Sequence, residues 1–213
     1  FDLDFAQNRS KPFESFFNEQ YYKFNELMGY DYSKDQSIAG KSSTKEIEIV
    51  TIFKNMLAND TFRKKFIDAF CVITGSVFEP TRVKEIVNAM VKYLSKGNYV
   101  NPTNSANELV SGLSSRQSRM LTQLKNCSLM NLSNKVSQTV TLSSSVEGAS
   151  ILVNGMEVPT GKFSGQLYAP ITLKATAPAG YRFLGWKSGD KCVSKNPEFE
   201  MPATGTQKLT AEW

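Results

Sequence analysis

The apolar residues of this chain change their spacing near residue 135, and this change limits the fold more than any other feature. From about residue 44 to 132 they recur every three or four positions, as on one face of an α-helix. After residue 135 they form short runs of β-type residues separated by Gly, Pro and Asn. We therefore predict a two-domain α+β protein. A helical subdomain spans residues 1–135, and a small all-β domain, β-grasp or sandwich-like, spans residues 136–213.

The local signals of residues 44–132 predict helices that pack through apolar faces. Asp60 is the natural N-cap of the second helix, and Pro80 occupies a first-turn position of the third. We expect the first three helices to pack together. A fourth, over about residues 104–125, keeps Arg116 and Arg119 on its more polar side.

The β-type part carries one strong turn signal and one aromatic cluster. Asn154-Gly155 predicts a two-residue hairpin, because both residues tolerate positive φ. Tyr181, Phe183 and Trp186 are predicted to alternate along one strand and share a face, which would be the core; if exposed, it would be a binding surface. Strands are predicted over residues 136–143, 149–153, 171–177, 181–186 and 208–213.

Histidine is absent from the chain, which excludes several classes of active site. Ser-His and Cys-His nucleophile pairs, imidazole bases and imidazole metal ligands cannot come from these residues. Catalysis would have to rest on carboxylates, lysines, tyrosines or a bound metal. The net charge of +5 is mild and the basic clusters are short, so no nucleic-acid partner is expected. No apolar run is long enough to cross a bilayer.

The cysteines give little support for a metal or redox site. Cys71, Cys127 and Cys192 lack the paired C-x-x-C spacing of zinc sites and redox dithiols. At most one disulfide can form among them. A bond between Cys127 and Cys192 across the domain boundary would suit an extracytoplasmic protein, and the sequence leaves their pairing open.

The chain opens on an acidic motif, Phe1-Asp2-Leu3-Asp4-Phe5, with no initiator methionine before it. In a strand, Asp2 and Asp4 would point to the same side, with Leu3 packed behind them. Two carboxylates on one side are hard oxygen ligands of the kind that Mg²⁺ uses beside substrate phosphates. The same Asp-x-Asp spacing is common in surface loops and helix caps, and both interpretations stand. Because the chain begins inside a motif, we expect a fragment whose missing N-terminal part holds most of the chemistry.

A second phosphate-binding candidate, residues 37–43, is rejected. Gly40-Lys41-Ser42 matches the end of a phosphate-binding loop, but Asp35 stands where the first glycine is needed and no apolar strand precedes it. We expect a flexible surface loop there.

Two groups of motifs resemble known families. The opening Phe1-Asp2-Leu3-Asp4-Phe5, with NDTFRKKFIDAF at residues 59–70 and VFEPTRV at residues 77–83, resembles the C-terminal part of spore-coat CotH kinase-like proteins. ITLKATAPAGYRFLGW at residues 171–186 and LTAEW at residues 209–213 resemble a divergent internalin-type bacterial B-repeat. Together the resemblances cover nearly the whole chain, in an order similar to that in surface proteins of Bacteroidetes.

The CotH resemblance implies that the helical subdomain is the C-terminal lobe remnant of a kinase-like fold. The full-length parent would be an atypical protein kinase that transfers a phosphoryl group from ATP. Asp-Leu-Asp would take the place of the kinase Asp-Phe-Gly motif, so Asp2 or Asp4 would hold the Mg²⁺ that bridges the ATP phosphates; which one does so stays open. The phosphate-binding lysine and the catalytic-loop aspartate and asparagine lie upstream in the family. This piece alone should therefore be inactive and bind no cofactor, and none of its residues is assigned as catalytic.

The resemblance leaves two functions open. No glycine closely follows the acidic motif, so the full-length protein is either an active kinase or a pseudokinase. It would be extracytoplasmic: periplasmic, secreted, or held at the bacterial cell surface, for example as a lipoprotein, and it would act on a protein substrate or surface partner. The alternative is a non-enzymatic surface or adhesion protein whose helices are a scaffold and whose β-repeat is a spacer or binding module.

Overall fold

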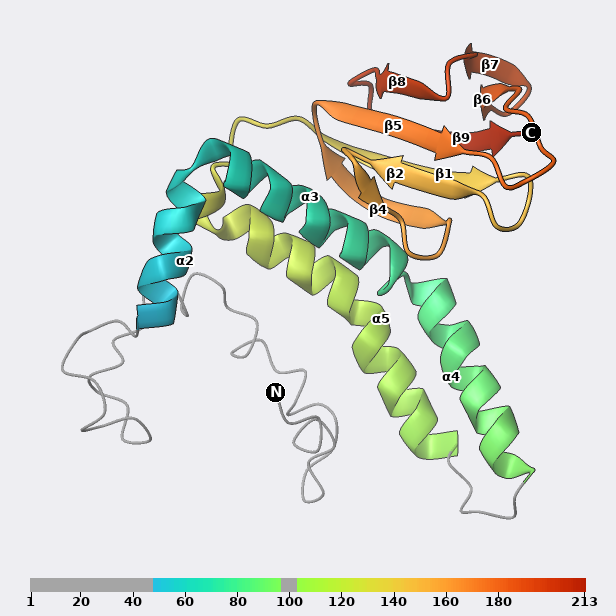
Figure 1. The fold of residues 1–213 in the computed structure, drawn as a ribbon. Coiled ribbons are helices and arrows are strands. Elements are labelled where there is room, and N and C mark those ends of the chain that lie inside the picture. The colour runs from blue at the N-terminus through green and yellow to red at the C-terminus, as the bar shows by residue number, and fades with distance from the viewer. Residues whose placement is uncertain (1–47, 97–102) are drawn as a thin grey trace.

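The computed structural model describes residues 48–96 and 103–213, which form a helical part followed by a β part (Figure 1). The expectations for Asp2, Asp4 and the loop at residues 37–43 fall outside these residues. The helices described are α2 (Glu48–Ala58), α3 (Asp60–Ser76), α4 (Pro80–Ser95) and α5 (Thr103–Asn126), followed by a short 3-10 turn, η5 (Ser128–Met130).

The N-cap of α3 differs from the prediction by one residue. Asn59, and not Asp60, is the cap: its backbone is extended, and its side-chain oxygen accepts a hydrogen bond of 3.0 Å from the Phe62 N–H. Asp60 is the first residue of the helix and forms an ion pair with Arg63. Asn and Asp are equally good caps, so the type of residue alone could not decide between these neighbours.

Pro80 begins α4, as predicted, in the first turn, where its missing N–H has no helical partner to lose. Glu79 is the N-cap, and its carboxylate accepts hydrogen bonds from the N–H groups of Thr81 (3.1 Å) and Arg82 (2.8 Å). The negative charge of Glu79 also favours this end of the helix dipole.

Packing among the helices is centred on α5. Helix α2 packs against α3, as expected, but α4 packs mainly against α5 and makes no extensive contact with α2 or α3. The expected cluster of the first three helices is therefore wrong for α4. Figure 1 shows α5 running beside α4 and then beside α3, so that the helical part is elongated.

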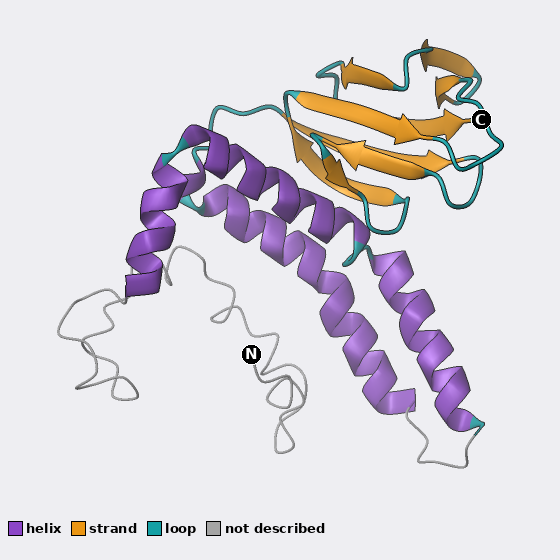
Figure 2. Cartoon of the chain, in the orientation of Figure 1, coloured by secondary structure: helices purple, strands orange, loops and turns teal. Residues whose placement is uncertain are grey.

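The β part contains two sheets, drawn as arrows in Figure 2. One has the strand order β4-β1-β9-β6-β7, and the other has the order β3-β2-β5-β8. Neighbouring strands are antiparallel except β1 and β9, which are parallel. The strands are β1 (Ser137–Ser144), β2 (Ser150–Val153), β3 (Met156–Glu157), β4 (Phe163–Tyr168), β5 (Ile171–Thr176), β6 (Gly185–Ser188), β7 (Lys191–Ser194), β8 (Glu198–Met201) and β9 (Thr206–Glu212).

Asn154 and Gly155 form the predicted hairpin turn between β2 and β3. Their φ angles are 51° and 80°, in the left-handed region that Asn and Gly tolerate best. Val153 pairs with Met156 directly across the turn. This prediction is confirmed.

The strand predicted over residues 181–186 is wrong in its first part. Residues 181–184 are irregular, and β6 begins only at Gly185. The Tyr181 N–H donates a hydrogen bond of 3.2 Å to the Pro178 carbonyl, because the chain turns there through Gly180 with φ 88°. A turn at this point prevents the regular alternation of side chains that a strand would give.

The three aromatic residues of this segment do not share a face, and a regular strand would not have given one either, because Trp186 is three positions after Phe183 and strand side chains alternate with period two. Tyr181 is 53% exposed, Phe183 is partly buried and Trp186 is fully buried. The Phe183 ring packs edge-on against Trp186 and Trp213, with centroid distances of 6.1 and 5.3 Å. Phe183 and Trp186 thus belong to the core of the β part, and Tyr181 faces solvent.

The helical and β parts share one hydrophobic core. A continuous cluster of buried side chains includes Leu57 and Leu124 from the helices and Phe163 and Trp186 from the strands. Helix α3 packs along β4 and β3, which are edge strands of the two sheets. The predicted α+β architecture, with helices first and an all-β part second, is confirmed.

Candidate functional site

Asp2 and Asp4, the candidate metal ligands, lie outside the described residues, and their role stays a prediction. In residues 48–96 and 103–213, no group of three or more His, Cys, Asp and Glu side chains is arranged to hold a metal ion.

The basic cluster of α3 makes contacts within the protein. Arg63 donates a hydrogen bond of 2.7 Å to the Leu57 carbonyl at the end of α2, and it pairs with Asp60. The Lys64 ammonium lies 2.7 Å from an Asp68 carboxylate oxygen. Arg116, in the other basic cluster, lies with its guanidinium carbon 5.3 Å from the centre of the Phe78 ring.

All three cysteines are free thiols, so no disulfide joins Cys127 to Cys192. Cys71 and Cys127 are buried, whereas Cys192 is exposed on β7. Burial, together with the nearby Asp68 carboxylate, raises the pKa of the Cys71 thiol to about 12. Burial and then the neighbouring Cys71 raise the pKa of the Tyr168 phenol. These raised pKa values keep both groups protonated near neutral pH, so neither is an activated nucleophile.

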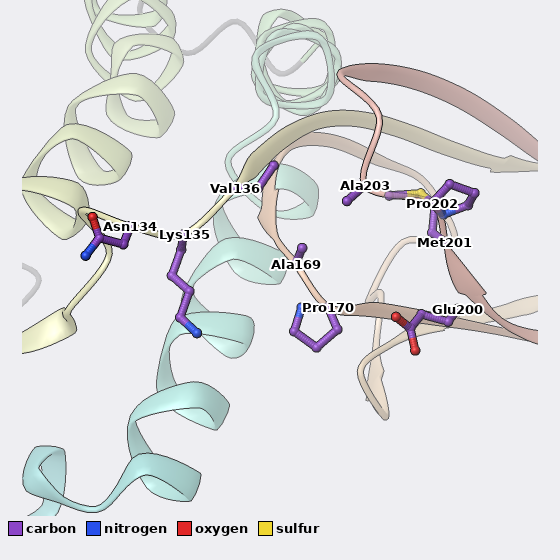
Figure 3. A pocket seen from close by; sticks show the side chains of 9 residues that line it. All are labelled: Asn134, Lys135, Val136, Ala169, Pro170, Glu200, Met201, Pro202 and Ala203. Atoms are coloured by element: carbon purple, nitrogen blue, oxygen red, sulfur yellow. The ribbon is translucent and has the colours of Figure 1, made fainter.

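An open pocket of about 410 Å³ lies where the chain passes from the helices into the β part. Figure 3 shows Lys135 and Glu200 on opposite sides of Pro170. Both charged side chains are exposed, so water and salt screen them strongly. Most of the residues that line the pocket are apolar, and none of them is a buried titratable group. Its lining residues are Asn134, Lys135, Val136, Ala169, Pro170, Glu200, Met201, Pro202 and Ala203.

Helix α4 carries a second surface feature, an exposed apolar stripe. Ile86, Met90, Tyr93 and Leu94 are all at least 42% exposed, and Tyr93 reaches 79%. Their spacing places them on one side of the helix, which they share in part with the buried Val83 and Val87. The spacing of apolar residues over 44–132 predicted that the apolar faces of the helices pack inward, and here part of one such face is exposed.

The comparisons with known proteins identify the two parts of the chain. A family model described as CotH kinase protein matches residues 1–127. This chain belongs to the CotH kinase family. A second model, described as divergent InlB B-repeat domain, matches residues 139–213. Searches of the curated proteins and of the solved structures found no match.

In this CotH-family chain, the two matches follow the two structural parts closely. The CotH match contains the acidic motif and all four helices described, and it ends one residue after α5. The B-repeat match begins inside β1 and contains both sheets. In the part of the chain that the structure describes, no helix combines the length and apolar character that a membrane span requires.

The residues that join the CotH part to the B-repeat were not predicted from the sequence. These are Asp68 and Gly75 of α3, Gln117 of α5, and Asn154 and Gly165 of the strands. Asn154 was identified as a turn residue, but nothing near it in the sequence indicates its bond to Asp68, which lies 86 positions away. A glycine near the end of a helical pattern, such as Gly75, was the one local signal of a close contact.

Proposed function

We propose that this chain is part of a CotH-like protein kinase that is secreted or anchored at the bacterial cell surface. In the full-length protein this kinase transfers a phosphoryl group from ATP to a protein substrate. The match to the CotH kinase family over residues 1–127, with Asp2 and Asp4 at its start, is the observation that carries the proposal.

The acidic motif has the donor chemistry that this function needs. Two carboxylates are hard oxygen ligands, which suits Mg²⁺, and no histidine or thiolate in the motif would favour a softer metal. When bound, Mg²⁺ neutralises charge on the ATP phosphates during transfer. Asp2 or Asp4 would hold this ion, and the helices α2 to α5 would be part of the scaffold of the kinase-like part.

A non-enzymatic surface protein is the second candidate, and the exposed stripe of α4 favours it. Ile86, Met90, Tyr93 and Leu94 form an apolar surface of the kind that mediates contact between proteins. In this case the CotH part would be a pseudokinase scaffold. The fully buried Trp186 does not support a binding surface at the aromatic motif of the B-repeat.

Calorimetric titration of Mg²⁺ and ATP into the full-length protein tests the proposal. Asp2→Ala and Asp4→Ala should abolish or strongly weaken Mg²⁺-dependent ATP binding, and the larger effect should identify the principal ligand. Asp190→Ala, an exposed acid in the B-repeat, is the matched control and should leave binding unchanged.

The outcomes separate the two candidates. Loss of binding in either motif variant, with phosphoryl transfer to protein in the parent, would support the kinase assignment. Unchanged binding in both variants would overturn the metal assignment. A full-length protein that binds neither Mg²⁺ nor ATP would overturn the kinase assignment and favour the surface protein.

A further inference from the structure

Helix α3 covers one side of the β part. Each of the two sheets has an edge strand on this side. The helix packs against β4, an edge of the five-stranded sheet, and against β3, an edge of the four-stranded sheet (Figure 1). Edge strands carry backbone N–H and C=O groups without ladder partners, and a helix can cover them. Here the covering helix belongs to the CotH part, and the covered strands belong to the B-repeat.

Two glycines let the backbone of α3 approach β4. A Cβ atom on Gly75 would lie 2.1 Å from Cε2 of Phe163, and one on Gly165 would lie 3.0 Å from Cα of Gly75. Normal contacts between carbon atoms are about 3.5–4.0 Å. The Phe163 side chain is itself buried in the shared core, so a movement of the ring would disturb its packed neighbours. The surface of α3 around Gly75 is therefore shaped to fit the surface of β4 around Phe163 and Gly165.

Gln117 of α5 connects the helices to the strand by hydrogen bonds. Its Nε2 donates to the Thr74 carbonyl of α3 at 3.0 Å and to the Ser164 carbonyl of β4 at 2.7 Å. Thr74 lies in the last turn of α3, where carbonyls lack helical partners. One side-chain amide thus serves a carbonyl from the CotH part and a carbonyl from the B-repeat.

A buried carboxylate holds the hairpin turn of the B-repeat. Asp68 is 5% exposed, and its two oxygens accept hydrogen bonds from Asn154 Nδ2 (2.9 Å) and Lys64 Nζ (2.7 Å). The Asn154 side-chain oxygen in turn accepts a bond of 2.7 Å from the Thr172 N–H. A buried charge is unfavourable unless its oxygens are bonded. Asp68 is therefore stable in this position because the B-repeat supplies one of its two partners.

We propose that the B-repeat is an integral part of the CotH fold in this protein, and that the two parts unfold as one cooperative unit. We call the contact between them the α3–β junction, and it consists of Asp68, Gly75, Gln117, Asn154 and Gly165. Both parts contribute to one core, so unfolding either would expose apolar side chains of the other and break the bonds of the junction. An independent spacer would instead keep a core of its own and leave the helices unchanged. This inference goes beyond the proposed kinase function and does not depend on it.

The chain contains a separate optical probe for each part. Its two tryptophans, Trp186 and Trp213, both lie in the B-repeat, so tryptophan fluorescence follows unfolding of the β part. Far-UV circular dichroism is dominated by the helices and follows the CotH part. Urea unfolding of the unmodified chain should give the same midpoint with both probes. Two separate transitions in the unmodified chain would overturn the proposal, and this test needs no variant.

Variants far from the junction test whether damage in one part destabilises the other. Leu57→Ala in α2 and Leu209→Ala in β9 each shorten a leucine that is 1% exposed. In one cooperative unit, each variant should lower the melting temperature seen by both probes by the same amount, roughly 5–15 °C. If each variant shifts only the probe of its own part, the proposal is wrong. Lys65→Ala, exposed on α3, is the control and should shift neither probe.

Variants inside the junction test the Asp68–Asn154 bond itself. Asp68→Ala and Asn154→Gly should each lower both midpoints, and Gly at position 154 keeps the positive φ of the turn. The double variant should lose less than the sum of the single losses, because both changes remove the same bond. Lys64→Ala removes only the half-exposed partner of the carboxylate and should have a smaller effect. If the loss in the double variant equals the sum of the two single losses, or if only one probe shifts, the Asp68–Asn154 bond does not link the two parts.

Discussion

Replacing Gly75 with alanine sets two well-understood effects against each other. Helix propensity alone predicts a gain, since alanine is up to about 1 kcal/mol better than glycine inside a helix. Gly75 is the second-last residue of α3, so this gain should be smaller than the interior value. Packing predicts a loss, because the new Cβ would lie 2.1, 2.6 and 2.7 Å from three carbon atoms of the Phe163 ring.

The size of the packing loss follows from the space around Phe163. To restore a normal contact of about 3.5 Å, the ring and helix must separate by more than about 1 Å. Phe163 is 1% exposed and belongs to the shared core, so this movement disturbs several packed neighbours. Extra carbon atoms in a packed core usually cost about 1–3 kcal/mol. We expect a net loss of about 1–2 kcal/mol, or a melting temperature lower by roughly 2–8 °C for a chain of this length.

Thermal and urea unfolding of Gly75→Ala, beside the unmodified chain, measure this loss. Phe163→Leu removes ring atoms that the new Cβ would meet, so Gly75→Ala should cost less in that background than in the unmodified chain. Lys65→Ala, on the exposed side of the same helix, should stay within about 0.5 kcal/mol of the unmodified chain. If Gly75→Ala is as stable as the unmodified chain or more stable, α3 does not approach β4 as closely as described, and the reasoning fails.

Further predictions concern the cap of α3, the hairpin turn and the buried thiol. Asn59→Ala should cost about 0.5–2 kcal/mol in urea unfolding, and more than Asp60→Ala; the reverse order would restore Asp60 as the cap. Asn154→Ala should be less stable than Asn154→Gly by at least about 1 kcal/mol, because position 154 has φ 51°, and equal stability would contradict this backbone geometry. A thiol reagent should label Cys192 in the folded chain and Cys71 only after unfolding, and rapid labelling of Cys71 would contradict its burial. Folding raises the pKa of Cys71 from 9.0 to about 12, so the unfolded chain releases this proton first and stability should fall as pH rises between these values; unfolding midpoints that do not fall there would argue against the raised pKa.

The features that the sequence predicted correctly depend on neighbouring residues. Pro80 starts α4 because a proline loses nothing in the first turn of a helix. Asn154-Gly155 forms a hairpin because both residues accept positive φ. The acidic motif with Asp2 and Asp4 was also read from local spacing, and its metal role is still a prediction.

The features that the sequence did not predict depend on contacts between distant residues. The partners of Gln117 lie 43 and 47 positions away, and no local pattern marks them. The packing of α4 on α5 was missed because a helical stripe shows which side is apolar and not which neighbour covers it. The prediction of a strand from residue 181 was wrong for a related reason. The β-type residues suggested a strand, but the chain turns at Pro178 and Gly180, and β6 begins only at Gly185.

The covering of β4 by α3 has a consequence for how the protein is made. A chain leaves the ribosome from its N-terminus, so α3 and α5 are synthesised before β4. The helix that covers the strand therefore exists before the strand does. A newly made β4 can pair with β1 on one side and meet α3 on the other, which limits the time in which its edge is open to strands of neighbouring chains. The same B-repeat made without the helices would lack this protection and should aggregate more readily during synthesis.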